Sequence, residues 1–220
     1  MKTALLAVSM CAAAFAQDKA APKAAPAKPD LMNPSALNAK APDTFKAKFT
    51  TSKGDFVVQV TRAWAPRGAD RFYNLVRAGF FTDCAFFRVL REPRPFMAQF
   101  GISPKPAVAA AWERARIMDD PNKESNKRGR ITFATAGANT RTTQLFINYG
   151  DNAFLDGQGF SPFGEVIEGM EVVDKFYSGY GEGAPSGRGP EQGKLQSEGK
   201  AYTDRYFPQL DHIISATIVP

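Results

Sequence analysis

Apolar and polar residues alternate with a period of two in several short stretches of the chain. Phe45, Ala47 and Phe49 alternate with lysines, and a second apolar stretch runs from Phe56 to Val60. The turn-forming residues 52–55 lie between these stretches, which predicts a β-hairpin. The same reasoning predicts further strands, which cover residues 86–90, 96–100, 131–134, 144–148, 161–167 and 212–219.

Helical spacing is confined to a few segments. Pro66 suits a first helical turn, Ala69, Phe72 and Val76 follow on one face, and Gly79 ends the segment. A second short helix is expected around residues 170–177, and a third could lie within 107–118. Strands joined mostly as hairpins, with two clear helices, predict a mainly β chain that forms a closed antiparallel barrel capped by helices.

Residues 1–16 have the pattern of a secretory signal peptide. Lys2 precedes an apolar run, and Ala14-Phe15-Ala16 fits the small-x-small rule for cleavage. The large Met10 before Cys11 argues against a lipoprotein site. The chain is therefore expected to be exported, to the periplasm or the medium, and no later apolar run is long enough for a membrane helix.

The next segment, residues 17–42, is rich in Ala, Pro and Lys and poor in large apolar residues, which predicts a disordered linker before a domain at residues 43–220. Loss of Lys2 with the signal peptide would lower the formal charge from +6 to +5. The remaining basic residues of the linker are dilute and have no aromatic neighbours. Nucleic-acid binding is therefore not expected.

Few residues suit metal or nucleophilic chemistry. Cys84 would be the only thiol after cleavage, and its apolar neighbours indicate a buried, inert side chain. Asp119 and Asp120 precede a proline and are interpreted as a turn, not as metal ligands. His212 is the only histidine and is expected to be structural. We therefore expect no metal, no cofactor and no hydrolytic triad.

The stretch from Phe86 to Gly101 carries the most suggestive chemistry. Strand alternation places Arg88 on the face opposite Phe87 and Val89, and Met97 shares a face with Gln99. In the 144–148 strand, alternation likewise turns Gln144 and Phe146 away from the core. An aromatic residue that faces away from the core is typical of a binding surface.

Three motifs in order give the chain a resemblance to a known family. They are FFRV with FMAQ (86–89 and 96–99), FATAGANTRTTQLFI (133–147), and FLDG with FGEVIEGM (154–157 and 163–170). Together they resemble the cyclophilins, the eight-stranded barrel family of peptidyl-prolyl cis-trans isomerases. The similarity covers roughly residues 45–219.

The resemblance implies roles for individual residues. Arg88 matches the catalytic arginine, and Gln99 the glutamine that supports it. The residues that match the wall of the proline pocket are Phe96, Met97, Phe146 and Leu155. Those that match the strip holding the substrate backbone are Ala134, Thr135, Ala136 and Gln144. Phe160 is assigned to a position often held by a pocket histidine. Phe154 stands where eukaryotic members commonly have tryptophan, which implies weak cyclosporin binding.

The chain also departs from the family pattern. Phe87 replaces the usual histidine, Phe100 replaces a glycine, and the 91–95 connection is longer than usual. The loops at 103–129 and 178–211 look enlarged. The expected partners are proline-containing polypeptides and unfolded exported proteins, bound by a monomer. A non-catalytic proline-peptide-binding or chaperone module on the same fold stays open, since Phe87 and Phe100 could reshape the site.

Overall fold

The computed structural model describes residues 29–220. The strands are β1 (Thr44–Thr51), β2 (Gly54–Thr61), β3 (Arg88–Leu90), β4 (Met97–Phe100), β5 (Arg130–Phe133), β6 (Leu145–Asn148), β7 (Pro162–Glu168) and β8 (Ile213–Val219). The α-helices are α1 (Pro66–Arg77), α2 (Pro106–Glu113), α3 (Met170–Val173), α4 (Gln192–Glu198) and α5 (Lys200–Tyr206), and the 3₁₀ helices are η1 (Pro34–Ala36) and η2 (Ala153–Gln158).

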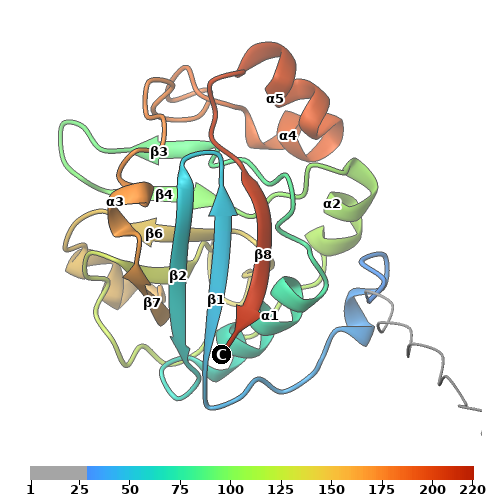
Figure 1. Cartoon of the computed structure of the whole chain (residues 1–220), viewed down its shortest axis with the longest axis vertical. Coiled ribbons are helices and arrows are strands. Elements are labelled where there is room, and N and C mark those ends of the chain that lie inside the picture. Colours follow the sequence, from blue (N-terminus) through green and yellow to red (C-terminus); the bar gives the residue numbers. More distant parts are fainter. Residues whose placement is uncertain (1–28) are drawn as a thin grey trace, which may run out of the picture.

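The eight strands form one antiparallel sheet in the order β3-β4-β6-β5-β7-β2-β1-β8. The sheet curls strongly, so that β1, β2 and β8 cross in front of β3, β4 and β6 (Figure 1). Its two ends meet where Ala85, just before β3, forms an isolated bridge with His212, just before β8. The predicted eight-stranded antiparallel fold is confirmed as a strongly curled half-barrel, in which β3 and β8 are the two edges of the sheet and this isolated bridge joins the residues beside them.

The core lies on the inner face of the curled sheet. Val89, Ala98, Ile147 and Ile131 are paired in register across four adjacent strands, and all are buried. Phenylalanines fill much of the space between the strands, as in the stacked pair of Phe49 and Phe56 with ring centroids 4.9 Å apart. The alternation in the sequence therefore indicated correctly which residues of these strands face inward.

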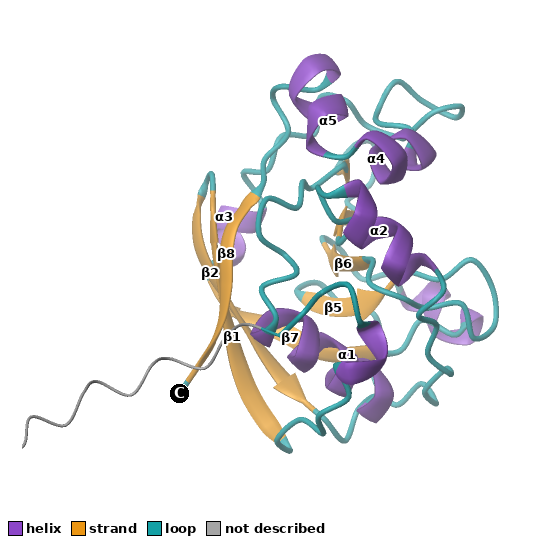
Figure 2. Ribbon diagram, turned by 90° about the vertical axis from the view of Figure 1, so that its right-hand side faces the viewer, coloured by secondary structure: helices purple, strands orange, loops and turns teal. Residues whose placement is uncertain are grey.

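The two predicted helices are present as α1 and the single turn α3, at the lower right and the left of the sheet in Figure 1. The third predicted segment contains α2, in which Trp112 is buried. Helices α4 and α5 were not predicted, because they lie in the segment interpreted as an enlarged loop. Helix α4 lies beside α2, and α5 lies beside α4, on one side of the molecule (Figure 2).

The predicted disordered linker is wrong in its last part. Leu37 and Ala41 are buried in the core, the Ala41 N–H donates to Asp70 over 2.8 Å, and the Trp112 indole donates to the Leu31 carbonyl over 2.9 Å. Hydrogen bonds from its backbone to side chains of α1 and α2, with a few apolar anchors, thus hold residues 31–41 in place. The amino-acid composition of the segment does not reveal such contacts. Residues 17–28 of the linker, the signal peptide and Cys11 lie outside the described residues.

Cys84 is fully buried, and this burial raises the pKa of its thiol far above the usual range. It is therefore the inert side chain that its apolar neighbours predicted. Within residues 29–220, none of the helices has the length and apolar character needed to cross a membrane.

Candidate active site

The register of the sheet brings the main candidate residues together on its outer face. Arg88 of β3 pairs with Gln99 of β4, and Gln99 pairs with Phe146 of β6. Directly paired residues on antiparallel strands point to the same side of the sheet. A guanidinium, a carboxamide and a phenyl ring therefore lie side by side on three adjacent strands.

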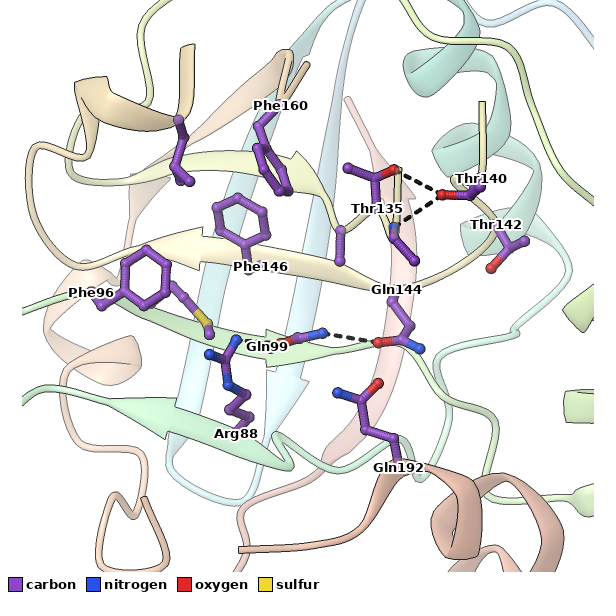
Figure 3. Close-up of a pocket in the computed structure, with 14 residues that line it drawn as sticks. Arg88, Phe96, Gln99, Thr135, Thr140, Thr142, Gln144, Phe146, Phe160 and Gln192 are labelled. Carbon is purple, nitrogen blue, oxygen red and sulfur yellow. Dashed lines mark hydrogen bonds between the residues drawn. The ribbon is translucent and has the colours of Figure 1, made fainter. Parts of the chain in front are cut away.

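Hydrogen bonds connect Arg88 to two glutamines. Its Nη1 donates to Gln99 Oε1 over 3.0 Å, and Gln99 Nε2 donates to Gln144 Oε1 over 2.9 Å (Figure 3). Gln99 is almost fully buried, so its amide has little freedom to turn away. The expected support of Arg88 by Gln99 is present, and Gln144 in turn holds Gln99.

A cavity of about 340 Å³ opens beside this chain of hydrogen bonds. One side is apolar, because Met97, Phe146 and Leu155 form a buried cluster with Phe96 and Phe160 packed against it. The lining residues are Arg88, Phe96, Met97, Gln99, Ala134, Thr135, Ala136, Thr140, Thr142, Gln144, Phe146, Leu155, Phe160 and Gln192. The cavity therefore combines a hydrophobic slot with a charged donor at its edge, and it contains every predicted site residue except Phe154.

Phe154 lies outside the cavity. Its side chain is 60% exposed, and its ring centroid lies 5.9 Å from that of Phe96. It is an outer neighbour of the slot, so its role in substrate binding stays a prediction. Phe160 lines the cavity, and its ring packs edge-on against Phe146 with centroids 5.8 Å apart.

The segment 134–144 is held against β4 by a close backbone approach. Gly101 has a φ of +99°, and a Cβ atom there would lie 2.3 Å from the Thr143 carbonyl oxygen. Thr143 also donates its hydroxyl to the Gly101 carbonyl over 2.8 Å. Only glycine permits this approach, which fixes the polar side of the cavity relative to Gln99.

The strip at residues 134–136, expected to hold the substrate backbone, has two of its backbone N–H groups engaged within the protein. The Ala134 N–H donates to the Gln144 carbonyl, and the Ala136 N–H donates to Thr140 Oγ1, each over 2.9 Å. These two donors are engaged within the protein and are not directed at a ligand. The polar side chains that line this wall include those of Thr142, Gln144 and Gln192 (Figure 3).

Sequence reasoning missed two contributors to the site. Gln192, the first residue of α4, lines the cavity from the segment interpreted as a loop. Glu182, which precedes α4, forms an ion pair with Arg88 at 2.5 Å. Neither position carries a local signal, since each reaches the site only through the folding of the 178–211 segment.

The departures at Phe87, Phe100 and 91–95 leave the cavity unobstructed. Phe100 is fully buried in the core. Alternation placed Phe87 on the same face as Val89, but in the structure Phe87 belongs to a different cluster. It packs with Ile102, Leu195 and Tyr202 under α4 and α5. Arg91 donates to the Asp174 carbonyl and lies over the Tyr149 ring. The concern that these residues narrow the site is therefore not supported.

The arrangement does not supply the ligands of a metal centre. Among the described residues 29–220, the His, Cys, Asp and Glu side chains form no group of three or more that could hold a metal ion. The chemistry of the cavity rests on a fixed cation, carboxamides and an apolar slot.

Comparisons with known proteins agree with this geometry. The crystal structure of a cyclophilin-type peptidyl-prolyl cis-trans isomerase from Cryptosporidium parvum superimposes with a TM-score of 0.57 at 17% identity, covering 80% of this chain and 98% of that one. A second structure of that protein, in the presence of the dipeptide Ala-Pro, matches with the same TM-score. These similarities establish the fold.

Sequence relatives extend the agreement. Peptidyl-prolyl cis-trans isomerase A of Dickeya dadantii is 37% identical over 131 residues, which cover 57% of this chain and 67% of that protein. Isomerase B of Escherichia coli is 34% identical over 136 residues, covering 58% and 80%. Residues 46–192 match the family described as "Cyclophilin type peptidyl-prolyl cis-trans isomerase/CLD". The chain therefore belongs to the cyclophilin-type peptidyl-prolyl cis-trans isomerase family.

Proposed function

We propose that Arg88 and the adjoining cavity perform the family's reaction, the cis-trans isomerisation of X-Pro bonds, on polypeptides exported from the cell. The observation that carries the proposal is the placement of the Arg88 guanidinium at the edge of the Phe96–Met97–Phe146–Leu155 slot, where it lies 5.9 Å from the Phe96 ring. The slot has the apolar character that a pyrrolidine ring requires, and the cation lies beside it.

The reaction requires no bond to break. Rotation about an X-Pro bond is slow because it disrupts amide resonance, with a barrier of ~18–20 kcal/mol. A turnover of about 10–10³ per second requires lowering this barrier by roughly 4–7 kcal/mol. In the twisted state the proline nitrogen becomes pyramidal and regains a lone pair. A donor directed at that nitrogen therefore binds the twisted state more tightly than either planar state.

Arg88 is suited to be that donor. Arginine keeps its charge throughout the physiological pH range, and its fork of N–H groups is rigid. The bonds through Gln99 and Gln144 fix one side of the guanidinium. The apolar slot would hold the proline ring while the preceding carbonyl rotates, and the amides of Gln144 and Gln192 would bind the substrate backbone on the polar side.

A proline-isomerisation assay on the purified chain tests the proposal. Turnover of a short Ala-Pro peptide well above the uncatalysed rate is the expected result. Suppression of aggregation without such turnover would instead indicate a holding function on the same fold. Rates equal to those without protein, with no binding of the peptide, would reject both.

Phe146→Ala is expected to weaken binding of an Ala-Pro peptide by about tenfold or more, because an apolar pocket contact of even one methylene contributes ~1–3 kcal/mol. Phe146 is 4% exposed and forms the floor of the slot. Titration of amide chemical shifts with the peptide measures this affinity. Ile214→Ala is the control, since that apolar side chain is exposed on β8 and is not among the residues that line the cavity. An unchanged affinity in Phe146→Ala would contradict the pocket assignment.

The proposed location rests on residues 1–16, whose charge and apolar run are typical of a signal peptide. Mass spectrometry of the protein recovered from a bacterial periplasm or medium should give a mature chain that begins at Gln17. Recovery of the uncleaved chain from the cytoplasm would contradict export. The substrates proposed for that compartment are unfolded, proline-containing polypeptides.

A further inference from the structure

Arg88 has a second partner besides Gln99. Its Nε donates to Glu182 Oε1 over 2.5 Å, and its Nη2 donates to Glu182 Oε2 over 2.6 Å. The two parallel bonds form a bidentate ion pair, the arrangement in which an arginine–carboxylate contact is strongest and most directional. The side chains are 24% and 35% exposed, so solvent weakens the pair only in part.

Glu182 contacts Arg88 from outside the cavity. Arg88 lines the cavity, whereas Glu182 is not among the lining residues. A guanidinium has five N–H donors, and the bonds to Glu182 and Gln99 use three of them. One donor on each Nη atom is left for a substrate. The carboxylate therefore does not block the slot, and it fixes the plane in which the remaining donors lie.

The loop that carries Glu182 is held by its own backbone. The Gly189 N–H donates to the Glu182 carbonyl over 2.8 Å, and the Gly183 N–H donates to Glu182 Oε1 over 2.9 Å. A Cβ atom at Gly187 would lie 2.3 Å from the Glu182 carbonyl oxygen. The glycines of this segment thus permit a compact turn that orients the carboxylate.

Both ends of the loop contact α5 or the residue that directly follows it. The Tyr180 ring packs edge-on against Phe207 with centroids 5.0 Å apart, and the Glu191 N–H donates to the Tyr202 hydroxyl over 3.1 Å. Tyr202 in turn packs on Phe87, directly before Arg88. Helix α5 and most of α4 lie beyond residue 192, where the family match ends. Contacts from Tyr202 and Phe207, outside the matched range, thus help to hold the loop that places Glu182 against Arg88.

We propose that Glu182 is a positioning residue that, with Gln99, holds the Arg88 guanidinium in the orientation needed at the twisted X-Pro bond. The proposal rests on the proposed role of Arg88. Arginine is a long, flexible side chain, and a donor that must first find its orientation loses part of its effect on the rate. Gln99 restrains one side of the fork, and Glu182 restrains the other.

Steady-state kinetics of Glu182→Ala provide the test. We expect kcat for an Ala-Pro peptide to fall about tenfold, with KM changed less than about twofold, because misplacing a catalytic group affects the transition state more than substrate binding. Glu182→Gln, which keeps the shape and one acceptor, should recover part of the loss. Glu191→Gln is the matched control, since that exposed carboxylate pairs with Lys194 and not with Arg88.

Two further readouts separate positioning from a structural role. In an Arg88→Ala background, Glu182→Ala should cause no additional loss of kcat, because both changes remove the same interaction.

The pH dependence of kcat should also differ between wild type and Glu182→Gln. Arg88, the charged group that faces Glu182 among the described residues, donates to its carboxylate and holds the pKa of Glu182 below its ordinary value of 4.5. The pair is therefore complete above pH 4.5 and is lost as the pH falls through this lower pKa, a step that Glu182→Gln should lack.

Each alternative outcome has a distinct meaning. Unchanged kcat in Glu182→Ala would overturn the proposal, and a higher kcat would show instead that Glu182 restrains the enzyme. A loss in Glu182→Ala that persists in the Arg88→Ala background would assign the effect to the loop. An inactive wild-type chain, or full activity of Arg88→Ala, would instead contradict the proposed function.

Discussion

Arg88→Ala is expected to lower kcat/KM for an Ala-Pro peptide by about 10²–10³-fold, by analogy with the loss of one preorganised donor in other enzymes. The affinity for the peptide should change little, because the apolar slot and the glutamines remain. The Arg88 side chain lies on the outer face of the sheet and is partly exposed, so the fold should persist. A protease-coupled proline assay measures the rate, and circular dichroism checks the fold.

Arg88→Lys sharpens this test. Lysine keeps the charge but lacks the planar fork that bonds to Gln99 and Glu182 together, so it should recover little of the activity. Arg128→Ala is the matched control, because Arg128 pairs with Asp174 away from the cavity. Near wild-type turnover of the Arg88→Ala variant would show that Arg88 does not take part in catalysis.

Asp120→Ala should lower the free energy of unfolding by about 3–5 kcal/mol, the cost typical of breaking a buried ion pair by removing one partner. The Asp120 and Arg141 side chains are 0% and 1% exposed and lie 3.1 Å apart. Asp120 also accepts the N–H groups of Arg67 and Gly68 over 3.0 and 2.9 Å, at the start of α1. The substitution would therefore leave the buried Arg141 guanidinium with Asp119, at 3.2 Å, as its remaining ion-pair partner, and it would uncap a helix.

Denaturant unfolding measures this loss. Asp204→Ala serves as the control, since the Asp204–Lys200 pair is exposed on α5 and is expected to contribute at most about 0.5 kcal/mol. A change of similar size in both variants would show that the buried pair is not important for stability. Because Arg141 lies between Thr140 and Thr142, both of which line the cavity, Asp120→Ala should also reduce peptide binding.

The site residues that lie in strands could be predicted, because the alternation of apolar and polar residues showed which side chains face outward. Arg88, Gln99 and Phe146 were assigned to outward faces, and the sheet register then aligned them. The resemblance of the motifs to one family predicted the other residues of the apolar slot. The fold was predicted for the same reason, since each strand carries its own pattern of burial.

What was missed depends on contacts between distant segments. Glu182 lies 94 residues from its partner Arg88, and its own neighbours are glycines that indicate only a loop. Helices α4 and α5 have seven residues each, too few to be stable alone, and they are held by Leu195 and Tyr202 against Phe87. The packing of residues 31–41 was missed because it uses backbone hydrogen bonds and few apolar anchors.

Inward-facing and outward-facing residues alternate along β3, β4 and β6, so neighbouring positions in these strands are under different selection. In β4, substitutions at Ala98 and Phe100 would be selected against because they destabilise the core. Substitutions at Met97 and Gln99 would be selected against because they slow turnover in the cavity. Saturation mutagenesis scored for both abundance and rate should show the two kinds of failure in a zigzag with a period of two.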